Sequence, residues 1–379
     1  MLGLILLLLI GALTAFALTT LMMMHRLTHP PGKTYAWAVS RGKPGTPMEL
    51  PQPRAFEPRT LQLRAPAGRH TIECPAWYIP CDHPDGPLVI FTPGWGDSKL
   101  GVLPRLAPLV SRASAVLAWD PPGFGEAPGT CGLGVTEPAL LAEIIEQQLT
   151  ADPGFRRRGI VLFGSSLGAG VSIVAAGGGL DRADHPDRAP SRAAPSDGSA
   201  RFAVTPSASA SAALRRGGVI AEAPYREAPT PARNVMRLSG MPHRLNTPVA
   251  FALLAWMIRP RGGFGDLFAA LIWGWRGYDR ALHARRLNCP LMVLHPGQDE
   301  VSPVPDGEAI ARAAGAFHAA TTGVLPDHRA SPGRLVIVPG AAHNSLWTDE
   351  ATRPAAEAAV TAFLDEIAAA NRAPTDVNK

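Results

Sequence analysis

The sequence predicts an α/β fold in which a mostly parallel sheet is covered by helices on both faces. Short apolar runs rich in β-branched residues recur along the chain, as at 160–163, 219–223 and 289–294. Runs of this kind are typical of strands that are buried on both faces. Segments with helical periodicity separate them, and this alternation favours strand–helix–strand units. Glycine-rich loops directly follow several of the predicted strands. Functional residues are therefore expected at the carboxyl edge of the sheet.

Length and charge limit the possible classes of protein. The 379 residues are enough for one large domain with a membrane segment and an insertion. The net charge of +5 does not indicate a nucleic-acid partner, because the basic residues are scattered. Their longest run, 156–158, is short and is not interleaved with aromatic residues.

The cysteine pattern indicates neither a zinc site nor a dense disulfide framework. The four cysteines, Cys74, Cys81, Cys131 and Cys289, lack C-x-x-C spacing. Cys74 and Cys81 can pair in an oxidising compartment, but free thiols are favoured. We expect no metal and no organic cofactor.

The N-terminal segment, residues 1–25, is predicted to be a transmembrane anchor. Residues 2–24 form an apolar run without a charge that is long enough to span a bilayer as a helix. A cleaved signal peptide, with cleavage after Ala17, is the alternative. Basic residues follow the span at 26, 33, 41 and 43, so the positive-inside rule predicts a cytoplasmic catalytic domain.

The rest of the chain divides into a linker, a domain and a tail. Residues 26–58, rich in proline and glycine, are predicted to be a linker, and 372–379 a polar tail. The domain spans 59–371. Its predicted strands are 60–64, 70–79, 87–92, 115–119, 160–163, 219–223, 289–294 and 335–338. Its predicted helices are 100–111, 136–149 with Thr136 as N-cap, 167–176, 308–316 and 354–370.

Two insertions interrupt the alternation of strands and helices. Residues 177–218 contain few large apolar side chains and are predicted to be disordered. Residues 224–286 are predicted to form a helical lid. The aromatic and large apolar residues that suggest an acyl-binding wall are Trp256, Met257, Phe264, Leu267, Phe268, Trp273, Trp275 and Tyr278. They are equally consistent with the lid's own packing core or with a surface that touches the bilayer.

The residues from Gly164 to Gly168 form a G-x-S-x-G pattern between a predicted strand and a predicted helix. A strand, a tight turn and a helix place Ser166 at the tip of the turn, with its hydroxyl above the end of the strand. The glycines on either side let the strand and the helix pass close together. Ser166 is therefore the candidate nucleophile, and a glycine-rich turn without chemistry is the alternative.

A base and an acid are predicted at the same edge of the sheet. A serine hydroxyl needs a base within hydrogen-bond reach, and that base needs a group that orients it. His343 lies just past the last predicted strand, and Asp299 lies in the corresponding loop of the strand before it. Glu300 is the reserve candidate for the acid. The amides of Leu167 and Trp95, each in a loop or turn that follows a strand, are the candidate oxyanion donors.

These motifs together resemble the α/β-hydrolase superfamily, whose catalytic residues follow the chain order Ser, Asp, His. Residues 164–168 are similar to its nucleophile elbow, 297–303 to its acid loop and 340–343 to its histidine loop. Residues 120–125 are similar to its loop after the fourth strand. The departure is Pro93-Gly94, where many relatives have His-Gly. With the N-terminal anchor, the chain looks like membrane-tethered serine hydrolases of the esterase and serine-aminopeptidase-like branch.

The resulting expectation is a serine hydrolase that cleaves lipophilic carboxylic esters through an acyl-enzyme. Its partners would be a small-molecule or lipid ester and the membrane, with no nucleic acid. A thioesterase, a peptidase and an acyltransferase remain alternatives within the fold. A non-catalytic, membrane-tethered binding module is the alternative from another class.

Overall fold

The structure is a computed structural model that describes residues 1–64, 71–177, 204, 206–241, 243–258, 275, 277–322 and 333–372. For 316–322 and 333 it describes the backbone alone.

The described residues form an eight-stranded sheet with the strand order β1-β2-β4-β3-β5-β6-β7-β8. Its strands are β1 Glu57–Arg64, β2 Thr71–Pro80, β3 Leu88–Thr92, β4 Ala115–Trp119, β5 Ile160–Ser165, β6 Gly218–Glu222, β7 Leu291–Pro296 and β8 Gly333–Val338. β2 pairs antiparallel with β1 and β4, and the other pairs are parallel. The predicted mostly parallel sheet is confirmed.

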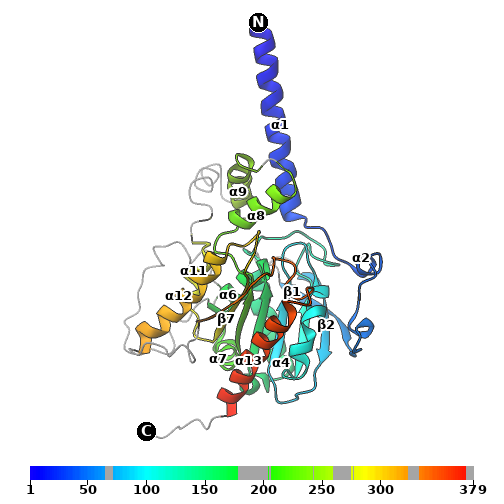
Figure 1. Ribbon diagram of the computed structural model, residues 1–379, viewed down its shortest axis with the longest axis vertical. Coiled ribbons are helices and arrows are strands. Elements are labelled where there is room, and N and C mark those ends of the chain that lie inside the picture. Colours follow the sequence, from blue (N-terminus) through cyan, green and yellow to red (C-terminus); the bar gives the residue numbers. More distant parts are fainter. Residues whose placement is uncertain are drawn as a thin grey trace.

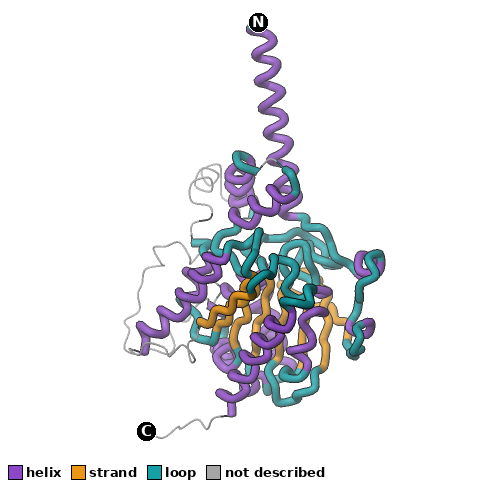
Figure 2. The backbone as a smooth tube through the Cα atoms, viewed as in Figure 1, coloured by secondary structure: helices purple, strands orange, loops and turns teal. Residues whose placement is uncertain are grey.

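Helices cover both faces of the sheet (Figure 2). One face packs against α4 Glu137–Ala151, α5 Phe155–Arg158, α6 Leu167–Gly177, α7 Ala208–Arg216, α11 Arg280–Ala284 and α12 Val304–Thr322. The other packs against η2 Lys99–Arg105, α3 Leu106–Val110 and α13 Arg353–Arg372. Successive residues of β3 alternate between these two cores, with Leu88 and Ile90 in one and Val89 and Phe91 in the other. This alternation is why the strands are apolar at every position.

Two local helix predictions need correction. The helix predicted at 100–111 is instead a 3₁₀ helix, η2, followed by the short α3. Pro104 lies inside η2 and lacks the N–H that a continuous α-helix needs there. Thr136 occupies the N-cap position of α4, but its hydroxyl makes no capping hydrogen bond. The buried carboxylate of Glu137 instead accepts the amides of Gly132 and Gly134 at 2.6 and 2.9 Å.

The segment 177–218 was predicted as disordered, and for its last part this prediction is wrong. The helix α7 lies within it, and β6 already begins at Gly218. Ala210, Ala213 and Leu214 are spaced to share one helix face, and this face is buried against the core. The hydroxyl of Ser207 caps the helix by accepting the amide of Ala210 at 3.1 Å. Residues 178–203 and 205 lie outside the described residues.

The N-terminal helix α1, Leu2–Thr28, projects from the body of the molecule (Figure 1). It is long and apolar enough to cross a membrane, with a mean hydropathy of 2.5. The helix extends past the predicted boundary at residue 25. Its last turns lie beside α8 Pro229–Leu238 and α9 Asn246–Met257, which fall within the predicted lid. Of the aromatic and large apolar lid residues, Phe264, Leu267, Phe268 and Trp273 lie outside the described residues.

The segment predicted as a linker, 26–58, is built into the domain. It contains the short helices α2 Tyr35–Val39 and η1 Pro47–Glu49. Ala38 is buried in the core that also holds η2 and α13. The hydroxyl of Thr34 caps α2, and the carboxylate of Glu49 accepts the amide of Gly45 at 2.9 Å. These local contacts order a proline-rich stretch whose composition suggests a flexible spacer.

All four cysteines are free, at 74, 81, 131 and 289. Burial raises the pKa of Cys74, Cys81 and Cys289 to about 12. Burial also raises the pKa of Cys131 well above its usual value. These thiols therefore carry almost no thiolate at neutral pH and react slowly while the protein is folded.

Candidate active site

Ser166 lies in a strained turn between β5 and α6. Its φ of 50° is in the left-handed region, which a residue with a side chain rarely adopts. The chain can make this turn because the positions two residues before and two residues after Ser166 are glycine. A Cβ at Gly164 would lie 2.1 Å from the carbonyl oxygen of Gly168, and one at Gly168 would lie 2.1 Å from that of Thr92. The amide of Ser166 donates to the carbonyl of Glu222 at 2.7 Å, which fixes the turn to the neighbouring strand β6.

Asp299 and His343 meet at the carboxyl ends of β7 and β8. Nδ1 of His343 lies 2.9 and 2.8 Å from the two carboxylate oxygens of Asp299. An ionised carboxylate only accepts, so Nδ1 carries the proton and Nε2 is left free to accept one. The amides of Val301 and Ser302 donate to Asp299 at 2.8 and 2.7 Å, which holds the carboxylate in place. The carboxylate is fully buried, and the imidazole is 10% exposed.

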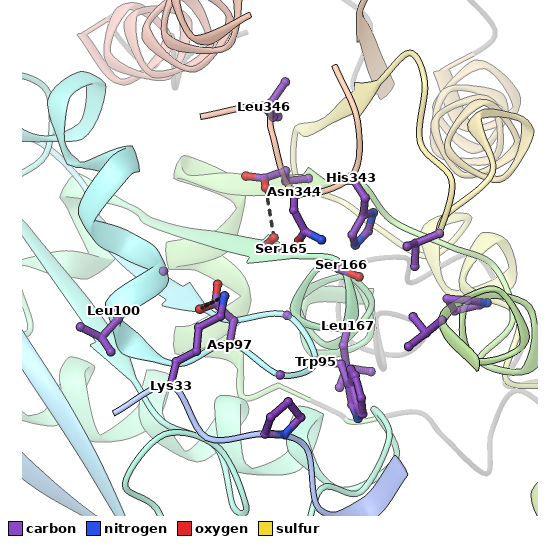
Figure 3. Close-up of a pocket in the computed structure, with 18 of the residues that line it drawn as sticks. Lys33, Trp95, Asp97, Leu100, Ser165, Ser166, Leu167, His343, Asn344 and Leu346 are labelled. Carbon is purple, nitrogen blue, oxygen red and sulfur yellow. Dashed lines mark hydrogen bonds and ion pairs between the residues drawn. The ribbon is translucent and has the colours of Figure 1, made fainter. Parts of the chain in front are cut away.

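The imidazole of His343 lies beside Ser166 in the close-up of the site (Figure 3). The three residues predicted from the sequence are therefore brought to one edge of the sheet by three separate loops. Glu300, the reserve acid, takes a different place. Its carboxylate accepts the backbone amide of His343 at 3.2 Å and makes no described contact with the ring.

The two candidate oxyanion donors flank the nucleophile. Leu167 opens α6, so its amide belongs to the unsatisfied first turn of that helix. Trp95 lies in the loop after β3, which passes close to Ser166. A Cβ on the neighbouring Gly94 would lie 3.2 Å from the Cβ of Ser166. The indole N–H of Trp95 donates to the carbonyl of Leu27 in α1 at 2.9 Å, which ties this loop to the N-terminal helix.

A buried ion pair, Arg105 with Glu222, contacts Ser165, the residue before Ser166. Nε of Arg105 donates to the carboxylate of Glu222 at 2.8 Å, and its Nη2 makes a second bond. The indole of Trp347 and the hydroxyl of Ser165 donate to the same carboxylate at 2.7 and 3.1 Å. Burial acts to lower the pKa of Arg105, but the attraction of Glu222 outweighs it and raises the pKa above its usual value. The carboxylate thus connects η2, the turn of Ser166 and the loop of His343.

Sequence reasoning missed this network. Glu222 lies at the end of the run from Val219, where a charged residue in a buried strand is itself a signal. Its partners Arg105 and Trp347 lie more than a hundred residues away on either side, so no local pattern identifies them.

A second buried histidine lies behind Asp299. Nε2 of His295 donates to the carbonyl of Ser302 at 3.0 Å and lies 3.7 Å from the carboxylate of Asp299. Burial lowers the pKa of His295, so we expect a neutral ring at pH 7. A neutral His295 carries no charge and therefore does not compete with His343 for an ion pair with Asp299.

Ser166 and His343 open into a cavity of about 760 Å³. In Figure 3, Lys33, Asp97 and Leu100 lie to one side of Ser166, and Trp95 lies toward another. The large apolar residues of the wall include Leu27, Trp37, Trp95, Leu133, Leu167, Val235, Leu238 and Phe251. The cavity is therefore walled by the N-terminal helix, the segment after it and the two lid helices, as well as by the sheet edge. Within the described ranges, no three His, Cys, Asp or Glu side chains form a group suited to a metal ion.

Known proteins share the fold. Residues 89–360 match the alpha/beta hydrolase family. The esterase Pf2001 of Pyrococcus furiosus has a TM-score of 0.54 at 15% identity, over 90% of this chain and 98% of that one. An acylaminoacyl peptidase of Pyrococcus horikoshii has a TM-score of 0.46 at 14% identity, over 83% of this chain and 41% of that one. No curated protein sequence matches. At 15% identity, the likeness to the esterase extends to the fold alone.

We expect the Glu222→Ala variant to lose about 3–5 kcal/mol of unfolding free energy, because it leaves the buried Arg105 charge unpaired. The measurement is urea denaturation of the full chain in detergent, followed by tryptophan fluorescence. Glu366 is the matched control, because its ion pair with Arg334 at 2.7 Å is exposed. Glu366→Ala should cost less than about 1 kcal/mol. Equal, small losses in both variants would contradict this account of the buried pair.

Proposed function

Because this chain belongs to the alpha/beta hydrolase family, we propose that it is a membrane-anchored serine hydrolase that cleaves lipophilic carboxylic esters through an acyl-enzyme. One observation carries the proposal. Asp299 is hydrogen-bonded to Nδ1 of His343, and the ring lies beside Ser166 in its strained turn.

In the first half-reaction, Oγ of Ser166 attacks the carbonyl carbon of the ester. Nε2 of His343 accepts the hydroxyl proton as the new C–O bond forms, and later gives it to the departing alcohol oxygen. The carboxylate of Asp299 holds the ring in the required tautomer and stabilises the imidazolium. The contact of Nδ1 with both carboxylate oxygens, at 2.9 and 2.8 Å, supports this role.

The negative charge that develops on the substrate oxygen needs donors near Ser166. We assign these to the amides of Leu167 and Trp95, each worth about 3 kcal/mol in the transition state. The place of Leu167 at the start of α6 and the close approach of Gly94 to Ser166 support the assignment. In the second half-reaction, water activated by His343 attacks the acyl-enzyme and releases the acid.

The walls of the cavity support a lipophilic acyl group. Leu27, Val235 and Phe251 face the space that holds Ser166, and they bring apolar surface from three different helices. Thioesters and peptides can react by the same steps, but the polar groups next to the cleaved bond in these substrates would match the apolar walls less well.

The exposed part of α1 supports a membrane anchor. Leu2, Leu7 and Leu8 are among its apolar side chains and are 64–81% exposed. A bilayer would cover them. The basic residues after the helix favour a cytoplasmic catalytic domain.

The Ser166→Ala variant should lose labelling by a fluorophosphonate probe and turnover of p-nitrophenyl butyrate. It has no hydroxyl for the probe to phosphonylate or for the ester to acylate. Labelling is read by in-gel fluorescence of the full-length protein. Ser172→Ala is the matched control, because Ser172 is a buried serine of α6 whose hydroxyl has no hydrogen-bond partner among the described residues. Labelling of Ser166→Ala at the wild-type level would show that the nucleophile is wrong.

Asp299→Asn should lower kcat by roughly 10³–10⁴-fold, because an amide next to Nδ1 favours the wrong tautomer of His343. Glu300→Gln, one residue away, should lower it by less than about tenfold, since this side chain accepts only a backbone amide of the histidine loop. The measurement is steady-state hydrolysis of p-nitrophenyl butyrate. If the larger loss falls on Glu300→Gln, the assignment of the acid is reversed.

We expect kcat/KM for p-nitrophenyl esters to rise from acetate to octanoate by up to about fourfold per methylene, as burial of each CH₂ is worth about 0.8 kcal/mol. Val235→Thr keeps the shape of the side chain and adds a hydroxyl to the cavity wall. This variant should lower the octanoate value more than the acetate value. A flat or falling series for the wild type would argue against a lipophilic acyl site.

A further inference from the structure

We propose that the cap, residues 229–258 with helices α8 and α9, lies in the surface of the same bilayer that α1 enters, with its arginines against anionic phospholipid headgroups. This inference rests on the membrane anchor in the proposed function. It adds a second lipid-binding surface and a direction from which substrate reaches the cavity.

The N-terminal helix is fixed to the cap. The side-chain amide of Asn246, at the start of α9, donates to the hydroxyls of Thr19 and Thr20 at 2.9 and 2.8 Å. One turn further along α1, Met23 and Met24 are buried in a cluster that includes cap residues. The preceding part of α1 extends away from the cap (Figure 1). A bilayer that surrounds this part of α1 must therefore end close to the cap.

The helix α9 is apolar on both of its faces. Leu254 belongs to the face that is buried against the rest of the cap. On the opposite face, Leu245, Val249 and Trp256 recur with helical spacing and are 74, 38 and 45% exposed. Met257 beside them is 60% exposed. A surface helix in water carries polar residues on its outer face, and α9 has no charged residue at all.

The length and composition of α9 favour an orientation in the plane of the membrane. Its 12 residues are too few to span a bilayer. An exposed tryptophan with leucine and methionine around it is typical of helices that lie at the boundary between headgroups and acyl chains.

The charge of the cap fits an anionic lipid surface. Its sequence contains Arg233, Arg237 and Arg244 and no aspartate or glutamate. All three arginines are exposed. Basic residues next to an apolar stripe bind anionic headgroups while the stripe inserts beneath them.

The inner side of the same cap lines the cavity of Ser166. Val235 of α8 and Phe251 of α9 form part of its wall, and Leu27 of α1 completes this side. A cap with lipid on its outer face and the cavity on its inner face gives the substrate a short path from the bilayer. Membrane-dissolved esters would reach Ser166 without crossing bulk water.

The test places an environment-sensitive nitrobenzoxadiazole probe at Leu245→Cys and, separately, at Met257→Cys in the full chain. Three of the native thiols are buried and Cys81 is partly buried. All four label slowly, since burial raises the pKa of Cys74, Cys81 and Cys289 to about 12 and that of Cys131 well above its usual value. The control is Ala369→Cys, an exposed position near the end of α13, which points away from α1 in Figure 1. Each protein is reconstituted into vesicles of phosphatidylcholine and phosphatidylglycerol that carry doxyl-labelled lipid, and flotation confirms membrane association.

The doxyl lipid should quench the fluorescence of the probes at 245 and 257 at least about twofold more strongly than that of the probe at 369. The reason is that only positions 245 and 257 would lie at the depth of the acyl chains. Equal quenching at all three positions in floating vesicles would overturn the proposal. A blue shift of the probe emission at 245 and 257 without doxyl quenching would show that protein, such as a second copy of the chain, covers this face of the cap. That result would also overturn the proposal. Protein that fails to float would overturn both the anchor and the docked cap.

A further variant tests the headgroup contact. Arg233→Gln, Arg237→Gln and Arg244→Gln, combined in the probe-bearing chain, should reduce the excess quenching seen with phosphatidylglycerol over phosphatidylcholine alone. Quenching that does not depend on phosphatidylglycerol in the unaltered chain would overturn the anionic-lipid part. The same measurements in a Ser166→Ala background should give the same quenching. A failure of the proposed chemistry is thereby separated from a failure of the docked cap.

Discussion

The close approach of three backbone segments around Ser166 is the constraint on which the rest of the site depends. The turn brings Gly164 against Gly168, and Gly168 in turn packs on the carbonyl of Thr92 at the end of β3. Any side chain at either glycine would force the strand, the turn and the helix apart. The neighbouring strand β6 then holds the turn through the carbonyl of Glu222. The unfavourable φ of Ser166 is maintained because the surrounding sheet leaves the turn no room to relax.

The carboxylate of Glu222 extends this constraint to the other loops. One buried group binds Arg105 below the loop after β3, Ser165 before the proposed nucleophile and Trp347 beyond His343. A buried charge is costly unless all of its acceptor sites are used, so the partners are held in fixed positions. The histidine loop and the nucleophile turn, far apart in sequence, therefore share one point of attachment.

The sequence predicts those features that depend on local patterns. The strands β3 to β8 and Ser166 follow from short apolar runs and from one glycine-flanked turn. Asp299 and His343 follow from their place after parallel strands, because that topology puts the ends of neighbouring strands at one edge. Some failures are local, such as the helix interrupted by Pro104 and the cap that Glu137 supplies in place of Thr136. The others involve contacts with distant residues. Helix α7 is held by a core that its alanine-rich composition does not reveal. Helix α2 is held by its Thr34 cap and by the burial of Ala38 in the domain core. The partners of Glu222 are likewise unidentifiable without the fold.

The bond from the indole of Trp95 to the carbonyl of Leu27 couples the N-terminal helix α1 to the candidate active site. The last turn of α1 forms part of the cavity wall through Leu27. It also holds the loop of Trp95, which lies close to Ser166. Removing this turn would open the cavity wall and leave the indole of Trp95 without its bond to Leu27. A fragment that begins after residue 28 would therefore lack Leu27 from the cavity wall and the bond that this residue makes with Trp95.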